Sequence, residues 1–140
     1  MKCLLLAFCA LFLLTDGDNG KPSEKDLNLL KGNWKVVSMV HNGKDIPNAE
    51  DHGITFDGEN VTIKEPNGES KGKCTRLDPA KDPKQIDLTP DGGGKKLQGI
   101  YELKGDELKL CLTRSDSERP SRFESKEGSN SRLVVLKREK

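Results

Sequence analysis

The sequence predicts an all-β protein, a small antiparallel up-and-down barrel of about eight strands preceded by a short helix. After Gly32, short runs of alternating apolar and polar residues follow one another, and no helical period interrupts them. Gly, Pro and Asn separate these runs, which is typical of tight turns between neighbouring antiparallel strands. A flat meander of this length would leave two unpaired edges, and closure into a barrel removes them.

Composition limits the chain to one small domain. The 140 residues are 32 % hydrophobic, and a continuous apolar run from Cys3 to Leu14 uses many of these residues. The remainder fills only one small core, which excludes a two-domain enzyme with an interdomain cleft. The 24 basic and 23 acidic residues are interspersed. No basic stripe follows a phosphate backbone, so we expect no nucleic-acid partner.

The N-terminus has the pattern of a secretory signal peptide. Met1 and Lys2 precede the apolar run, and Thr15 and Gly17 are the small residues that a cut after Gly17 requires. The run is too short to cross a hydrocarbon layer roughly 30 Å thick. We therefore predict a signal peptide at 1–17, a secreted or periplasmic protein, and no membrane span after cleavage. A retained anchor and a buried helix are the alternatives.

The domain at 26–140 follows a polar leader at 18–25. Ser23 begins a segment with the spacing of a helix N-terminal capping box. Leu27 and Leu30 then fall on one face of a short helix, and no further helix is predicted after it.

Eight or nine short strands follow the helix. The dipeptide Asn42–Gly43 favours a tight hairpin turn, and Pro90–Gly94 forms the most flexible tip. The expected strands cover 34–41, 54–56, 61–63, 73–77, 85–89, 97–103, 108–112, 122–124 and 132–137.

Alternation along these strands selects the side chains that face the barrel interior. Side chains can just fill an eight-stranded barrel, or the barrel can hold one small ligand, and the pattern leaves both options open. The expected inward set is Trp34, Val36, Val40, Ile54, Phe56, Val61, Ile63, Ile86, Leu88, Leu97, Tyr101, Leu103, Leu108, Leu110 and Leu112.

Signal cleavage would leave two cysteines in the mature chain, Cys74 and Cys111. Export allows a disulfide between them, and closing such a loop stabilises a protein by roughly 3–4 kcal/mol. Two buried thiols that never meet are the alternative.

Gly32 and Trp34, at the start of the first strand, resemble the Gly-x-Trp signature of lipocalins and fatty-acid-binding proteins. In those barrels the Trp closes the base, and a basic side chain from near the end of the chain packs over its ring. The ring quadrupole favours such a contact. The resemblance assigns structural roles to Gly32, Trp34 and Arg138, with Arg132 and Lys137 as the other basic candidates.

Further strings support a second resemblance that spans roughly 26–140. They are Leu30–Val37, Leu77–Pro79, Pro83–Asp87, Gly99–Leu103, Glu118–Pro120 and Val134–Arg138. This stretch is similar to an uncharacterised lipocalin-like domain of exported bacterial proteins, a family expanded in planctomycetes. The resemblance implies a small barrel and export, and it brings no assigned activity. The Thr-Asp-Tyr string of lipocalins is absent, as is the helical pair of fatty-acid-binding proteins.

The sequence contains no convincing catalytic or metal-binding constellation. Gly68–Gly72 satisfies the Gly-x-Ser-x-Gly pattern, but no predicted helix follows it and no histidine lies beyond His52. His41, Asp45, Asp51 and His52 fit no metal-ligand spacing, so we expect exposed loop residues there. We predict a protein that is not an enzyme and has neither catalytic residues, nor a metal, nor another cofactor.

Binding of a small apolar ligand at the open end of the barrel is the function that we expect. The Tyr101 hydroxyl would supply the polar group that orients a ligand in such pockets. The first alternative is a filled barrel that serves as a protein-interaction or envelope structural module, which the 4 % aromatic content favours. The second is an enzyme with convergent polar groups at the barrel mouth. The candidate ligand contacts are Met39, Phe56, Tyr101, Leu110 and Phe123.

Overall fold

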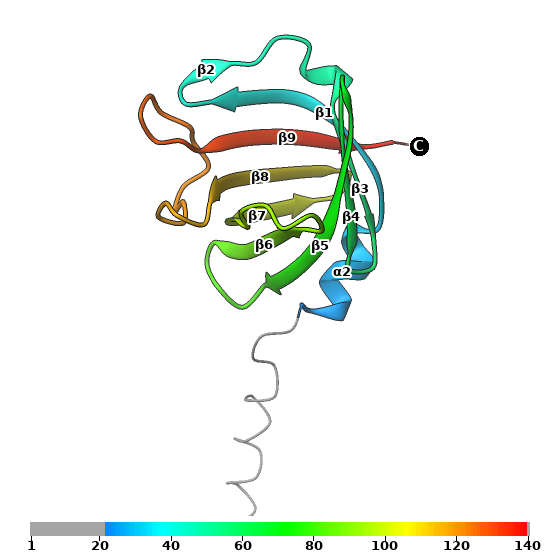
Figure 1. The fold of residues 1–140 in the computed structure, drawn as a ribbon. Coiled ribbons are helices and arrows are strands. Elements are labelled where there is room, and N and C mark those ends of the chain that lie inside the picture. Colours follow the sequence, from blue (N-terminus) through cyan, green and yellow to red (C-terminus); the bar gives the residue numbers. More distant parts are fainter. Residues whose placement is uncertain (1–21, 140) are drawn as a thin grey trace, which may run out of the picture.

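The chain folds into a closed antiparallel β-barrel of eight strands with a short helix at one end (Figure 1). The computed structural model describes residues 22–139, so the predicted signal peptide at 1–17 lies outside the described residues. The elements are α2 (Glu24–Leu30), β1 (Gly32–His41), β2 (Lys44–Asp45), η3 (Ala49–Asp51), β3 (Gly53–Asp57), β4 (Asn60–Glu65), β5 (Gly68–Asp78), β6 (Lys84–Pro90), β7 (Leu97–Lys104), β8 (Glu107–Arg114) and β9 (Arg132–Arg138). The predicted all-β barrel with a short N-terminal helix is confirmed.

Pairing of the last strand with the first closes the barrel. From β3 to β9 each strand pairs antiparallel with its successor in the chain, and β9 lies along β1 (Figure 1). The other edge of β1 is shared, because its first residues pair with β3 and its last two with the short β2. One strand therefore takes part in three pairings.

A β-bulge at Val37 decides which residues of β1 face the interior. The register with β9 shifts between Val36 and Ser38, and Val37 is 53 % exposed. One extra residue inverts the alternation beyond it. Met39 is therefore buried, and Val40 is not part of the core. The expectation that Val40 faces inward was wrong, because strict alternation leaves no place for an extra residue.

A second bulge has the same effect in β5. The register with β6 shifts between Cys74 and Arg76, which leaves Thr75 as the extra residue. Cys74 and Leu77 both join the hydrophobic core, although the expected inward set lacked them. Every other member of the expected set, apart from Val40, is buried in this core or packs against it.

Helix α2 covers one end of the barrel. The Ser23 Oγ accepts a 3.4 Å hydrogen bond from the backbone N–H of Asp26 at the start of the helix. Leu27 and Leu30 are both buried. The Trp34 indole N–H donates a 2.8 Å hydrogen bond to the Leu30 carbonyl, so the helix end is tied to the start of β1.

Arg138 lies over the Trp34 ring, with its guanidinium carbon 4.3 Å from the ring centroid. Its two terminal nitrogens donate hydrogen bonds to the carbonyls of Lys31 and Leu29, at 2.8 and 2.9 Å. Gly32 leaves room for this arginine, because a Cβ there would meet the Arg138 Nη1 at 3.3 Å. Gly32 also has a φ of +126°, which L side chains rarely adopt. Arg138 thus joins the helix end to the barrel base.

The long loop at 115–131 lies outside the barrel wall. The expected strand at 122–124 was wrong, since the loop contains no strand. Serine side chains, rather than a strand ladder, provide hydrogen-bond partners for many backbone groups of this loop. One example is the hydrogen bond that the Ser125 Oγ donates to the Ser131 carbonyl. The loop covers Ile100 and Cys111, which are buried but separate from the interior core.

Replacing Trp34 with alanine is expected to lower the free energy of unfolding by about 3–5 kcal/mol, because a large buried side chain and its contact with Arg138 are lost. Urea unfolding followed by far-ultraviolet dichroism measures this change. Val37→Ala is the control, since a substitution at an exposed position usually stays within about 0.5 kcal/mol. Equal unfolding midpoints for the two variants would contradict the assigned role of Trp34.

Candidate functional site

A cavity of about 590 Å³ opens at the end of the barrel opposite α2. Small-molecule sites have volumes of about 300–1,000 Å³ and predominantly apolar linings. The walls come from β1, β3, β4 and the strands from β7 to β9. Their apolar side chains are Val36, Met39, Ile54, Ile63, Leu97, Leu112 and Val134. The cavity therefore has the size of a small-molecule site, and its lining combines an apolar wall with polar residues.

Polar side chains surround the mouth of this cavity. His41 and His52 line it, and the Nδ1 atom of each is buried without a hydrogen-bond partner among residues 22–139. Buried polar atoms usually have a partner in the protein or in bound water. Each of the two imidazoles at the cavity therefore has one ring nitrogen that no described group satisfies. The charged residues of the lining are Glu65, Arg114, Asp116 and Arg132.

His41 and Arg132 are direct partners across the pairing of β1 with β9. Both line the cavity, and side chains on one face of such a pair have Cβ atoms about 4.5–5.5 Å apart. Among the described residues, Arg132 forms no ion pair, whereas Asp116 is paired with Lys95. The hydrogen bond from Lys95 lowers the pKa of Asp116. One carboxylate at the mouth is therefore already neutralised by a lysine.

The backbone beside His41 and Arg132 is held by a compact network. The N–H of Asn42 donates to the Ser131 carbonyl at 3.1 Å. The Asn42 Oδ1 accepts hydrogen bonds from the N–H groups of Gly128 and Asn130, at 2.8 and 3.1 Å. Asn42 follows His41 and Ser131 precedes Arg132 in the chain. The network thus fixes both backbones at the mouth before any ligand arrives.

Of the five expected ligand contacts, the structure places only Met39 on the cavity wall. Phe56, Tyr101 and Leu110 are fully buried in the core and do not line the cavity. Phe123 lies in the loop at 115–131, outside the strands. For the first three, strand alternation gave the facing direction correctly but not the height along the barrel axis. Phe123 misses the cavity because the strand expected at 122–124 does not form.

The Tyr101 hydroxyl is occupied within the protein. It donates a 2.6 Å hydrogen bond to the Asp26 Oδ2, and both residues are buried. Burial, together with the hydrogen bond to Asp26, raises the pKa of Tyr101 above its ordinary value. The phenol therefore stays protonated and joins α2 to β7, and it is not the group that orients a ligand.

Sequence reasoning missed the histidines and arginines of the mouth. His41 and His52 were expected to be exposed, but both are half-buried and line the cavity. Arg132 was considered only as a partner for Trp34. The inward direction of His41 can be predicted once the bulge at Val37 is known, because Met39 and His41 then lie on the same inward face. Nothing in the sequence indicates that bulge.

Cys74 and Cys111 are free, so the disulfide alternative was wrong and the alternative of two separate thiols holds. Cys74 belongs to the interior core, whereas Cys111 lies outside it, under the 115–131 loop, where its Sγ contacts the Glu124 carbonyl at 3.4 Å. Burial raises the pKa of Cys74 to about 12, and burial also raises the pKa of Cys111.

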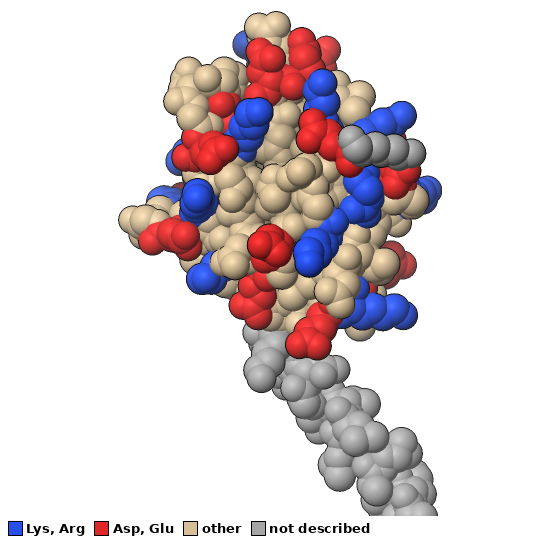
Figure 2. Space-filling view, turned by 90° about the vertical axis from the view of Figure 1, so that its right-hand side faces the viewer, with Lys and Arg blue, Asp and Glu red and all other residues tan. Residues whose placement is uncertain are grey.

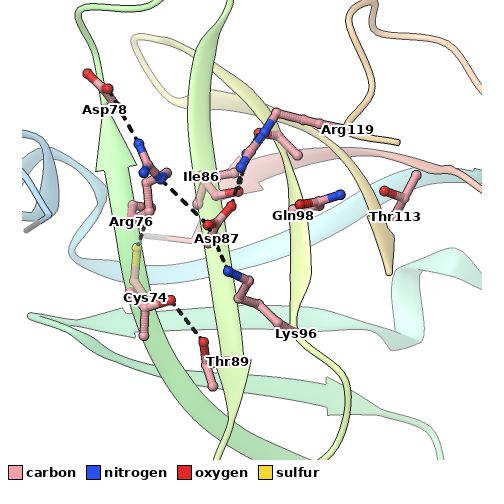
Figure 3. Close-up of polar contacts among 12 residues, drawn as sticks. Cys74, Arg76, Asp78, Ile86, Asp87, Thr89, Lys96, Gln98, Thr113 and Arg119 are labelled. Atoms are coloured by element: carbon pink, nitrogen blue, oxygen red, sulfur yellow. Dashed lines mark hydrogen bonds and ion pairs between the residues drawn. The ribbon is translucent and has the colours of Figure 1, made fainter. Parts of the chain in front are cut away.

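A second group of charges lies on the outer surface of β5 to β7 (Figure 3). The Asp87 side chain is 5 % exposed, and the Arg119 Nη1 approaches its Oδ1 to 2.9 Å. Arg76 and Lys96 lie 3.6 and 3.5 Å from its other oxygen. The same Arg119 nitrogen donates hydrogen bonds to two backbone carbonyls of β6 and β7. These contacts attach the long loop to the barrel, so this group has a structural role.

Two constellations that the sequence raised, a metal-ligand group and a nucleophile elbow, are not formed by the described residues. Between residues 22 and 139, no three His, Cys, Asp or Glu side chains are grouped as a metal site would need. Ser70 of the Gly-x-Ser-x-Gly string pairs with Ile63 inside the β4–β5 ladder, without a helix after it.

On the face shown in Figure 2, basic and acidic side chains are interspersed around an uncharged centre.

A scan against protein-family models, a search of curated proteins and a search of solved structures each found no match to this chain. The resemblance to an exported lipocalin-like family therefore stays a prediction. Within residues 22–139, no helix has the length and the apolarity that a membrane crossing requires.

Both thiols are expected to resist alkylation in the folded protein at pH 8, because the raised pKa values keep them protonated and only the thiolate is reactive. Mass spectrometry of the chain from Asp18 onward measures this after treatment with iodoacetamide. The unfolded chain, labelled in urea at the same pH, is the control and should gain two adducts. Rapid double labelling of the folded chain would contradict the burial of these thiols. Because the unfolded chain loses its thiol protons first, stability should also fall as the pH rises through the ordinary thiol pKa.

Proposed function

We propose that this protein binds one small, largely apolar ligand in the cavity and does so without catalysing a reaction. The cavity of about 590 Å³ is the observation that carries this proposal. Seven apolar side chains from six strands converge on it, and rigid ladders hold these strands on both sides. Such a site is preformed, which lowers the entropic cost of binding.

The energetics of the interior favour a ligand over the filled-barrel alternative. Protein cores are usually packed to the density of organic crystals. Apolar side chains that line a cavity open to water keep part of their surface hydrated, and removing that surface from water is favourable. A ligand with an apolar body covers this surface. A barrel that serves only as an interaction module gains nothing from this space.

The binding is proposed to take place outside the cytoplasm. This part rests on the apolar run and the small residues before Asp18, which have the pattern of a cleaved export signal. A protein of this kind would hold or carry a poorly soluble compound in an aqueous compartment.

Val36→Phe is expected to weaken binding by at least about tenfold, which corresponds to about 1.4 kcal/mol, because the larger ring occupies the cavity. Phenylnaphthylamine, a neutral probe whose fluorescence rises in apolar surroundings, measures the affinity. Val37→Phe is the matched control, since the neighbouring side chain points outward at the bulge and its substitution should leave the affinity unchanged.

Overpacking costs about 1–3 kcal/mol of stability, so thermal unfolding is measured for both variants. Leu97→Trp, at a half-buried position of the cavity wall, provides a second test if Val36→Phe does not fold. Absence of probe binding to the unmodified protein, or equal binding by all variants, would contradict the proposed function and favour the filled-barrel alternative.

Protein isolated from the extracellular or periplasmic fraction of its own host is expected to begin at Asp18, because the signal segment is removed at Gly17. Intact-mass measurement of that fraction checks the cleavage site. Native mass spectrometry of the same sample is expected to show additional mass from a retained ligand. A chain that keeps Met1 and stays in the cytoplasm would contradict export.

A further inference from the structure

The mouth of the cavity has an uneven distribution of charge. His41, Arg132 and Arg114 lie on the three adjacent strands β1, β9 and β8, and all three line the cavity. Glu65 lies on β4, which β3 separates from β1. The remaining acid of the lining, Asp116, already has a lysine partner. Basic groups therefore gather on one side of the opening.

Two side chains on this basic side have groups that no described protein group binds. Arg132 forms no ion pair among the described residues, and the buried His41 Nδ1 has no hydrogen-bond partner there. A guanidinium presents its N–H donors in a planar fork that matches a carboxylate, a sulfonate or a phosphate. The cross-strand register places His41 directly opposite Arg132.

The bulge at Val37 is what turns His41 toward Arg132. With strict alternation from the inward-facing Trp34, His41 would face outward. The extra residue reverses the facing direction, so His41 lines the cavity together with Met39. Bulges commonly re-aim a side chain beside a functional site. The Asn42 network then holds both backbones in place.

We propose that the ligand is an anionic amphiphile, whose apolar body fills the cavity and whose negatively charged group binds Arg132 and His41 at the mouth. This inference rests on the proposed function and adds the chemical class of the ligand. The anion keeps its orientation because the apolar wall below the mouth offers it no partner. Arg114 adds to the positive potential from the neighbouring strand.

The test compares two probes that share one aromatic body, the neutral phenylnaphthylamine and the anionic anilinonaphthalene sulfonate. Arg132→Gln is expected to weaken binding of the sulfonate by about tenfold, as the loss of a charged hydrogen bond implies. The same variant should leave the neutral probe within about twofold of its original affinity. His41→Leu should weaken the sulfonate selectively as well.

Lys137→Gln is the matched control, because it removes one positive charge from the exposed, outward face of the same strand. It should change neither affinity. Arg132→Lys, which keeps the charge but loses the planar fork, should retain part of the preference for the sulfonate. Val36→Phe should block both probes and thereby show that both occupy the cavity.

The outcomes separate this inference from the proposed function. If the neutral probe binds, Val36→Phe blocks it, and Arg132→Gln affects both probes equally or neither, then the anionic class is overturned and the apolar site stands. If neither probe enters the cavity, the proposed function itself fails and the inference fails with it.

Discussion

Pairing of β9 with β1 is the constraint on which the rest of the structure depends. It closes the barrel and so removes both sheet edges. The same ladder carries Trp34 opposite Arg138 at the closed end and His41 opposite Arg132 at the open end. The first pair is stacked and tied to α2. In the second pair, both residues line the cavity, and within residues 22–139 Arg132 has no ion-pair partner and the His41 Nδ1 has no hydrogen-bond partner. One strand pairing therefore carries the stabilising Trp34–Arg138 contact at one end and the candidate site at the other.

The few apolar residues of this chain are buried in two places, the barrel interior and the outer side of the barrel wall. The interior receives most of the large side chains. The 115–131 loop then covers Ile100 and Cys111 on the other side of the wall, and Arg119 attaches it near the buried Asp87. Three cations around one buried carboxylate offset the cost of removing that charge from water. The outer surface of the barrel thus also contributes to the stability of the wall.

Much of the fold was predictable, whereas most of the candidate site was not. Turn residues and alternation located every main strand, because each depends on a few neighbouring residues. The Gly32–Trp34 string indicated the closed end correctly. Phe56, Tyr101 and Leu110 were assigned to a ligand although they lie deep in the core. Their facing direction was right, but the depth of each residue follows from the tilt and stagger of all strands together.

The sequence by itself determined the class of fold, the short helix at the base and the tryptophan that packs there, since local pattern and turn chemistry decide these features. Only the tertiary structure decided that a cavity remains in the barrel and that His41 and Arg132 lie opposite each other at its edge. The reason is physical: a bulge moves side chains from one face to the other, and whether a residue is extra depends on the partner strand. Cys74 and Cys111 show the same limit, because the wall of the barrel separates them.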